Sequence, residues 1–216
     1  LCEVSRCKAP IRKSYLKELT RSQTVLPAHQ EARLERAVWA TWRPYFHKTR
    51  DRCVLPGDPF AEDISYIATY QLALFNAKER EGWGHVDLVG ISSDCTPVVI
   101  ELKAGGSTES PLRPILEAAC YGICIQRAWE DKLKSDWNCL LARFKMPAVD
   151  KLEQVRLVCA APQAYWCRWR KELTPEAWRL LGKICGQLEL QKMPVRFLNV
   201  NFTTSPADMS FSSRSN

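Results

Sequence analysis

The chain has 216 residues, of which 46% are hydrophobic and 25% are charged. This length and composition suffice for one substantial core and leave little room for a second full domain. No apolar run approaches the ~20 residues that a membrane span needs, and no secretory pattern opens the chain, which excludes a membrane partner from our expectations.

The net charge of +7 is unevenly distributed. Residues 1–60 carry twelve Lys or Arg against six Asp or Glu, whereas residues 61–110 carry three basic and eight acidic residues. Basic flanks suit a nucleic-acid partner, because lysine and arginine release counterions from phosphates, and an acidic centre repels that partner unless cations fill it. The alternative is that +7 is an ordinary solubility charge.

Ten cysteines are spread along the chain without a CxxC pair. Several lie in apolar stretches, where free thiols pack as small hydrophobic groups. We therefore expect a reducing, cytoplasmic compartment rather than a disulfide framework. An iron–sulfur cluster is the alternative, and the absence of paired ligands argues against it.

The first half of the chain predicts an arm, a helix and three strands. Residues 1–27 are polar and basic, a helix is expected over 28–42, and a loop rich in Pro, Gly and Asp follows at 44–59. A first strand is expected at 64–76. The segments HVDLVGIS (85–92) and PVVIELKA (97–104) flank a short polar turn, which is typical of a hairpin.

The second half predicts alternating helices and strands. Apolar spacing predicts helices from 111 and over 130–145, and the apolar run at 155–161 is typical of a strand covered on both faces. Thr174 and Pro175 predict the start of a helix that ends near 192, a last strand follows at 195–202, and residues 203–216 resemble a disordered tail.

This order of elements predicts an α/β fold. Residues 28–202 would form a single domain with a central mixed sheet of about five strands and helices on both faces.

Three residues of the predicted hairpin carry chemistry. Asp87 lies on one strand and Glu101 and Lys103 lie on the next, where alternation places the last two on one face. Asp87, Glu101 and the backbone carbonyl of Leu102 offer the oxygen ligands that Mg2+ prefers, and Mn2+ would substitute for it. Lys103 would orient or deprotonate an attacking water and stabilise the transition state. The pattern predicts phosphodiester hydrolysis.

The segment GHVDLVGISSDCTPVVIELKAG resembles the core of the PD-(D/E)xK, or restriction-endonuclease-like, nuclease superfamily. That motif places an Asp on one strand and E-x-K on the next, and thirteen residues separate Asp87 from Glu101 here. The resemblance implies a core of order αβββαβαβ, two acidic metal ligands and a catalytic Lys103. Val86 stands where the superfamily name has Pro.

Two acids on the helix before the sheet lie on or beside an apolar arc formed by Leu34, Val38 and Trp42. Many relatives carry a glutamate on this helix that completes the metal site. The resemblance implies this catalytic and metal-binding role for Glu35, with Glu31 as the reserve acid. The alternative is that either acid pairs with a surface base.

Arg113, Glu117 and Tyr121 are spaced four apart and resemble the RxxxQxxxY helix of several nuclease branches, with Glu in place of Gln. The resemblance implies substrate contacts; the alternative is a surface ion pair beside a tyrosine. His85 shares a strand face with Asp87 and would contact substrate or water, unless it is merely packed or solvated.

The leading hypothesis is therefore a DNA endonuclease or exonuclease of defence, repair, recombination or mobile-element biology. The alternatives are a non-cleaving nucleic-acid-binding or assembly module and an RNA-cleaving toxin or effector. Trp166 and Trp169 lie among basic residues and would stack on bases or pack in the core. Because the C-terminal half is short, a homodimer or a protein partner would supply specificity.

Overall fold

The computed structural model describes residues 66–73, 85–201 and 210–213, together with Glu31, Leu34, Glu35, Val38 and Ile64. The basic arm predicted at 1–27 and the loop predicted at 44–59 lie outside this part of the chain. Glu31, Leu34, Glu35 and Val38 are helical, in agreement with the predicted helix.

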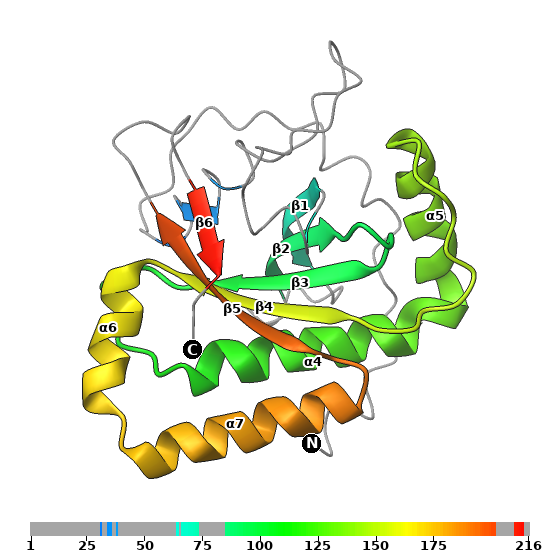
Figure 1. Ribbon diagram of the computed structural model, residues 1–216. Helices are drawn as coiled ribbons and strands as arrows, with labels where there is room; N and C mark the ends of the chain where they lie inside the picture. The colour runs from blue at the N-terminus through cyan, green and yellow to red at the C-terminus, as the bar shows by residue number, and fades with distance from the viewer. Residues whose placement is uncertain are drawn as a thin grey trace.

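A mixed sheet of six strands lies at the centre of the described fold, and the order of its strands is their order in the chain (Figure 1). The strands are β1 (Tyr66–Ala73), β2 (His85–Ile91), β3 (Pro97–Leu102), β4 (Arg156–Ala161), β5 (Val195–Asn201) and β6 (Ser210–Ser213). The first three pair antiparallel, β3, β4 and β5 are parallel neighbours, and β6 pairs antiparallel with β5. This confirms the predicted α/β fold with a mixed sheet.

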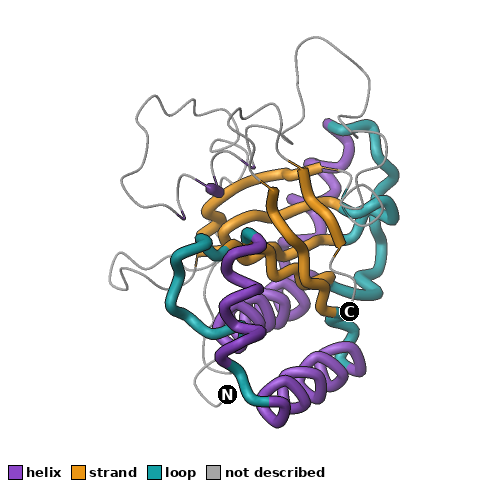
Figure 2. Tube along the Cα trace, turned by 60° about the vertical axis from the view of Figure 1, so that its left-hand side comes forward, coloured by secondary structure: helices purple, strands orange, loops and turns teal. Residues whose placement is uncertain are grey.

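Helices cover the sheet. They are α4 (Leu112–Ala128), α5 (Lys134–Arg143), α6 (Gln163–Glu172) and α7 (Pro175–Leu190), and a π-helical turn, η2 (Trp129–Leu133), joins α4 to α5. Helices α4 and α7 lie on one side of the sheet (Figure 1, Figure 2). On the other face Leu34 and Val38 pack with Leu88, Ile100 and Val158. No helix in the described part of the chain is long and apolar enough to cross a membrane.

Strand β3 is buried along its whole length, which fixes where its polar residues point. Val98, Ile100 and Leu102 pack on the face that Leu34 covers. Because side chains alternate along a strand, Glu101 and the following Lys103 point to the opposite face, toward α4. Both remain buried, with 3% and 6% of their surface exposed.

Two elements differ from the expectation. Strand β6 lies within residues 203–216, so the predicted disordered tail is wrong at Ser210–Ser213, where the backbone pairs with β5 and needs no apolar composition to do so. Helix α6 was not predicted. It begins at Gln163 without a side-chain cap, and its buried aromatic residues have modest helix propensity.

The turn that joins β2 to β3 is closed by Asp94. Its Oδ1 accepts hydrogen bonds from the hydroxyls of Ser92 and Thr96, the second at 2.8 Å, and its Oδ2 lies 2.8 Å from the Arg156 guanidinium. Cys95 takes the left-handed φ of 66° that this turn requires. Burial alone would raise the pKa of Asp94, but the two hydroxyls and Arg156 lower it below its ordinary value.

Candidate active site

At the other end of the same hairpin, Asp87 and Glu101 face each other. Leu88 pairs with Ile100, so the preceding Asp87 and the following Glu101 are neighbours across the two strands. Their carboxyl groups share a hydrogen bond. Asp87 Oδ2 also accepts a hydrogen bond of 2.7 Å from the Leu102 amide. Glu101 Oε1 is buried and has no hydrogen-bond partner among the described residues.

The surroundings of this pair disfavour the charged forms of both carboxyls. Burial raises the pKa of Asp87 to about 6, although the Leu102 amide and Lys103 favour its charged form. Burial and the adjacent Asp87 charge raise the pKa of Glu101 well above its ordinary value. Two desolvated carboxyls that share a proton gain a second charge readily when a cation binds them, because its field offsets their repulsion.

Lys103 lies beside the pair but is itself held by two acids. Its Nζ is 2.8 Å from Glu109 Oε2 and 3.2 Å from Glu117 Oε2, and 8% of its side chain is exposed. Burial alone would lower the pKa of Lys103, but Glu109, Glu117 and the other nearby carboxylates outweigh burial and raise it. Lys103 therefore stays cationic, which favours the predicted role in stabilising charge over the predicted role in deprotonating water.

Of the two acids predicted on the first helix, Glu31 contacts the motif strand. The Ala104 amide donates to Glu31 Oε1 at 3.4 Å, and the Glu31 charge acts on Asp87 and Lys103. Glu35 lies one helical turn further on and is buried. Glu31, the predicted reserve acid, thus contacts the backbone directly after Lys103, and Glu35 is buried on the same helix.

The number of acidic side chains at the site is small. No group of three His, Cys, Asp or Glu side chains converges closely enough to hold a metal ion among the residues described. The arrangement is a pair of carboxylates, Asp87 and Glu101, with Glu31 nearby. Two protein carboxylates plus water and substrate oxygens are how Mg2+ is commonly bound, because it gives up its waters reluctantly.

Of the three residues predicted on one face of α4, two lie near the site and one packs in the core. Arg113 and Glu117 form an ion pair on α4, and Glu117 reaches Lys103 as well. Tyr121 is 9% exposed and packs in the core beneath the sheet, a position that favours packing over the predicted substrate contact. His85 is exposed at the start of β2, two residues before Asp87.

Glu109, Tyr165 and Arg168 lie near the site and were not predicted as site residues. Glu109 lies in the loop between β3 and α4, and its backbone carbonyl accepts a hydrogen bond of 2.9 Å from the Tyr165 hydroxyl. Arg168 donates to the Ser107 carbonyl at 3.4 Å. The sequence signal for Glu109 is slight: an acid shortly after the glycine pair at 105 and 106, six residues beyond Lys103.

The two tryptophans of α6 have different surroundings. Trp166 is 1% exposed, and its Nε1 donates to the carbonyls of Ala161 and Leu198, so it packs in the core and base stacking is wrong for it. Trp169 is half-buried, with the Arg168 guanidinium 5.4 Å from its ring centre.

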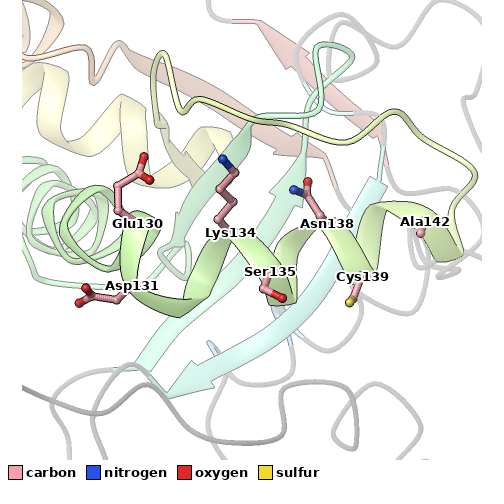
Figure 3. Close-up of a pocket in the computed structure, with 7 residues that line it drawn as sticks. All are labelled: Glu130, Asp131, Lys134, Ser135, Asn138, Cys139 and Ala142. Carbon is pink, nitrogen blue, oxygen red and sulfur yellow. The ribbon is translucent and has the colours of Figure 1, made fainter.

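A hollow in the surface lies elsewhere, along η2 and α5 (Figure 3). Its lining includes Glu130, Lys134 and Asn138 and none of the motif residues.

No family model matches the sequence, and no curated protein matches it. A solved structure with local similarity is a complex of EndoMS with double-stranded DNA, at 23% sequence identity and a TM-score of 0.28. The alignment covers 56% of this chain and 34% of that chain.

Proposed function

We propose that this chain is a magnesium-dependent nuclease that hydrolyses phosphodiester bonds in DNA. The observation that carries the proposal is the adjacent pair of a half-buried Asp87 and a buried Glu101 beside a cationic Lys103. Burying two adjacent carboxyls raises the free energy of the fold unless they have a use, and strained titratable groups gather at functional sites.

The donor set fits a hard divalent cation. Asp87 and the unpartnered Glu101 Oε1 would hold Mg2+ or Mn2+, with Glu31 as a nearby third acid and the Leu102 carbonyl as the predicted backbone ligand. When bound, the ion supplies Lewis-acid polarisation of the phosphate and a water of lowered pKa.

The protein side chains have separate tasks in this proposal. The Leu102 amide fixes Asp87 Oδ2 and so orients the carboxylate. Lys103, kept cationic, stabilises the negative charge that develops on the phosphate. Glu117 positions Lys103 from the rigid helix α4.

The substrate class follows from charge. The basic N-terminal and C-terminal thirds of the sequence favour a polyanion and the acidic centre favours a cation, which together fit a nucleic acid with its metal. A homodimer or a protein partner would add selectivity.

One observation favours a second candidate, the non-cleaving nucleic-acid-binding or assembly module. Glu109 and Glu117 both neutralise Lys103 in this structure, and a lysine so occupied offers less to a phosphate. An RNA-cleaving effector would use the same chemistry as the leading proposal, so substrate tests must separate the two.

The test is cleavage of supercoiled plasmid, linear duplex, single-stranded DNA and RNA with Mg2+, Mn2+ or EDTA. Glu101→Gln and Lys103→Gln keep the shape of the site, and Glu153→Gln removes an exposed acid elsewhere as the control. Metal-dependent cleavage of DNA that both site variants lose would support the proposal. Binding without cleavage on every substrate would favour the assembly module, and cleavage of RNA alone the effector.

A further inference from the structure

The two acids that pair with Lys103 lie on different elements and differ in their exposure to solvent. Glu117 stands on α4 with 19% of its side chain exposed. Glu109 stands on the loop that follows β3, with 41% exposed, although it lies closer to the lysine. Because an exposed carboxylate can exchange its partner for water at little cost, Glu109 is the acid that an incoming anion would displace.

Helix α6 holds the backbone of this loop in place. The buried Tyr165 donates its hydroxyl proton to the Glu109 carbonyl, and Arg168 donates to the Ser107 carbonyl. The Glu109 amide bonds the Ser107 hydroxyl at 3.4 Å. The main chain of Glu109 is therefore anchored, while its side chain is the more exposed of the two acids at Lys103, although the Oε2 atom that contacts the lysine is buried.

We propose that Glu109 is a specificity-determining residue whose carboxylate occupies the place at Lys103 that a substrate phosphate takes. A small phosphate ester offers one or two charges and competes poorly with a carboxylate tethered 2.8 Å from the ammonium. A nucleic acid brings many phosphates and gains contacts with basic residues elsewhere, so it displaces Glu109. The inference rests on the proposed function and names its substrate class, a polymer in preference to small phosphodiesters.

The first measurement needs no nuclease activity. Wild type, Glu109→Gln and the control Glu153→Gln are treated with acetic anhydride at one fixed pH, and acetylation of Lys103 is followed by peptide mass spectrometry. Glu153 pairs with Lys151 at 3.0 Å, an exposed ion pair at the other end of the sheet. We expect Glu109→Gln to speed acetylation of Lys103 about two- to fivefold, and Glu153→Gln to leave it unchanged.

The second measurement compares substrates. The KM of Glu109→Gln is measured with Mg2+ for a labelled duplex DNA and for bis(4-nitrophenyl) phosphate, with Lys103→Gln and the double variant assayed for binding of the same duplex. We expect the KM for the small ester to fall several-fold more than the KM for DNA. In the Lys103→Gln background, Glu109→Gln should no longer change binding of the duplex.

The outcomes separate the two proposals. If wild type cleaves DNA but Glu109→Gln changes neither acetylation of Lys103 nor the KM ratio, the inference fails and the proposed function stands. A faster acetylation with an unchanged KM ratio also overturns the inference, because Glu109 then shields Lys103 without selecting substrate. If no variant binds or cleaves any nucleic acid, the proposed function fails, and the inference fails with it.

Discussion

An aspartate lies at each end of the β2–β3 hairpin, and the surroundings of the two shift their pKa values in opposite directions. Asp94, at the turn, is surrounded by two hydroxyl donors and Arg156, which lower its pKa. Asp87, at the open end, is desolvated by burial, which raises its pKa to about 6 although the Leu102 amide, Lys103 and Glu101 lower it. The neighbours of Asp94 therefore stabilise its charged form, whereas the surroundings of Asp87 disfavour its charged form.

The surroundings of Asp94 contribute to stability, whereas those of Asp87 are explained by the proposed function. Compensated acids are the general rule in proteins, because burying an unpaired charge destabilises the folded state. Two adjacent acids whose charged forms are disfavoured, next to a lysine, are typical of a site where a ligand stabilises the carboxylate charges.

The largest effect is expected from Glu101→Gln. Removing one of two charged ligands should lower cleavage of DNA by at least about 10²-fold, while the free energy of unfolding stays equal or rises because a strained buried acid is gone. Steady-state cleavage and urea unfolding on the same preparations measure both quantities. A parallel loss of activity and stability would show that Glu101 is structural, and Glu153→Gln serves as the matched acid control.

The second prediction concerns pH and Asp87. Between its ordinary value of 3.8 and about 6, the folded state keeps a proton that the unfolded state releases, so the folded state binds more protons. The free energy of unfolding must therefore fall as pH rises through this window, by about 3 kcal/mol for a shift of this size. Glu101 acts in the same direction.

Urea unfolding between pH 4 and 7 in metal-free buffer measures this slope. Asp87→Asn keeps the bond from the Leu102 amide and should flatten the slope. Saturating Mg2+ should flatten it as well, since a bound cation favours the ionised pair. Equal slopes in wild type and Asp87→Asn would contradict the strained pair.

The third prediction is Asp94→Asn, which removes the charge opposite Arg156 and weakens the bonds from Ser92 and Thr96. Because Asp94 is partly exposed, we expect a loss of about 1 kcal/mol in unfolding free energy. Cleavage should stay within about twofold of wild type, as ordinary surface changes do. The sign of the pH effect is opposite to that of Asp87: the stabilisation is present above pH 3.8 and is lost as pH falls through the lowered pKa.

The hairpin and its facing acids were predictable because both depend on local rules. A polar turn between two apolar segments predicts antiparallel pairing, and alternation along β3 puts Glu101 and Lys103 on one face. The N-cap of α7 is equally local: Thr174 accepts from the Ala177 amide at 3.2 Å, as the sequence predicted.

What sequence could not predict depends on contacts between distant segments. Glu109 lies only six residues beyond Lys103, but the loop that brings them together is anchored by Tyr165 and Arg168, which follow more than fifty residues later. Those anchors belong to α6, a helix without an obvious start signal. Strand β6 likewise depends on the exposed edge of β5, which no pattern within residues 210–213 reveals.

The smallest effect is expected from Glu153→Gln, which gives a reference value for the stability lost in Asp94→Asn. Glu153 pairs with Lys151 at 3.0 Å, but both side chains are more than two-thirds exposed. Solvent screening and side-chain entropy limit such a pair to less than about 0.5 kcal/mol, whatever its distance. If Glu153→Gln costs as much as Asp94→Asn in urea unfolding, the hydroxyl shell around Asp94 contributes nothing beyond an ordinary ion pair. If Asp94→Asn instead lowers the unfolding free energy clearly more than Glu153→Gln does, the additional stability comes from the Ser92 and Thr96 donors to Asp94.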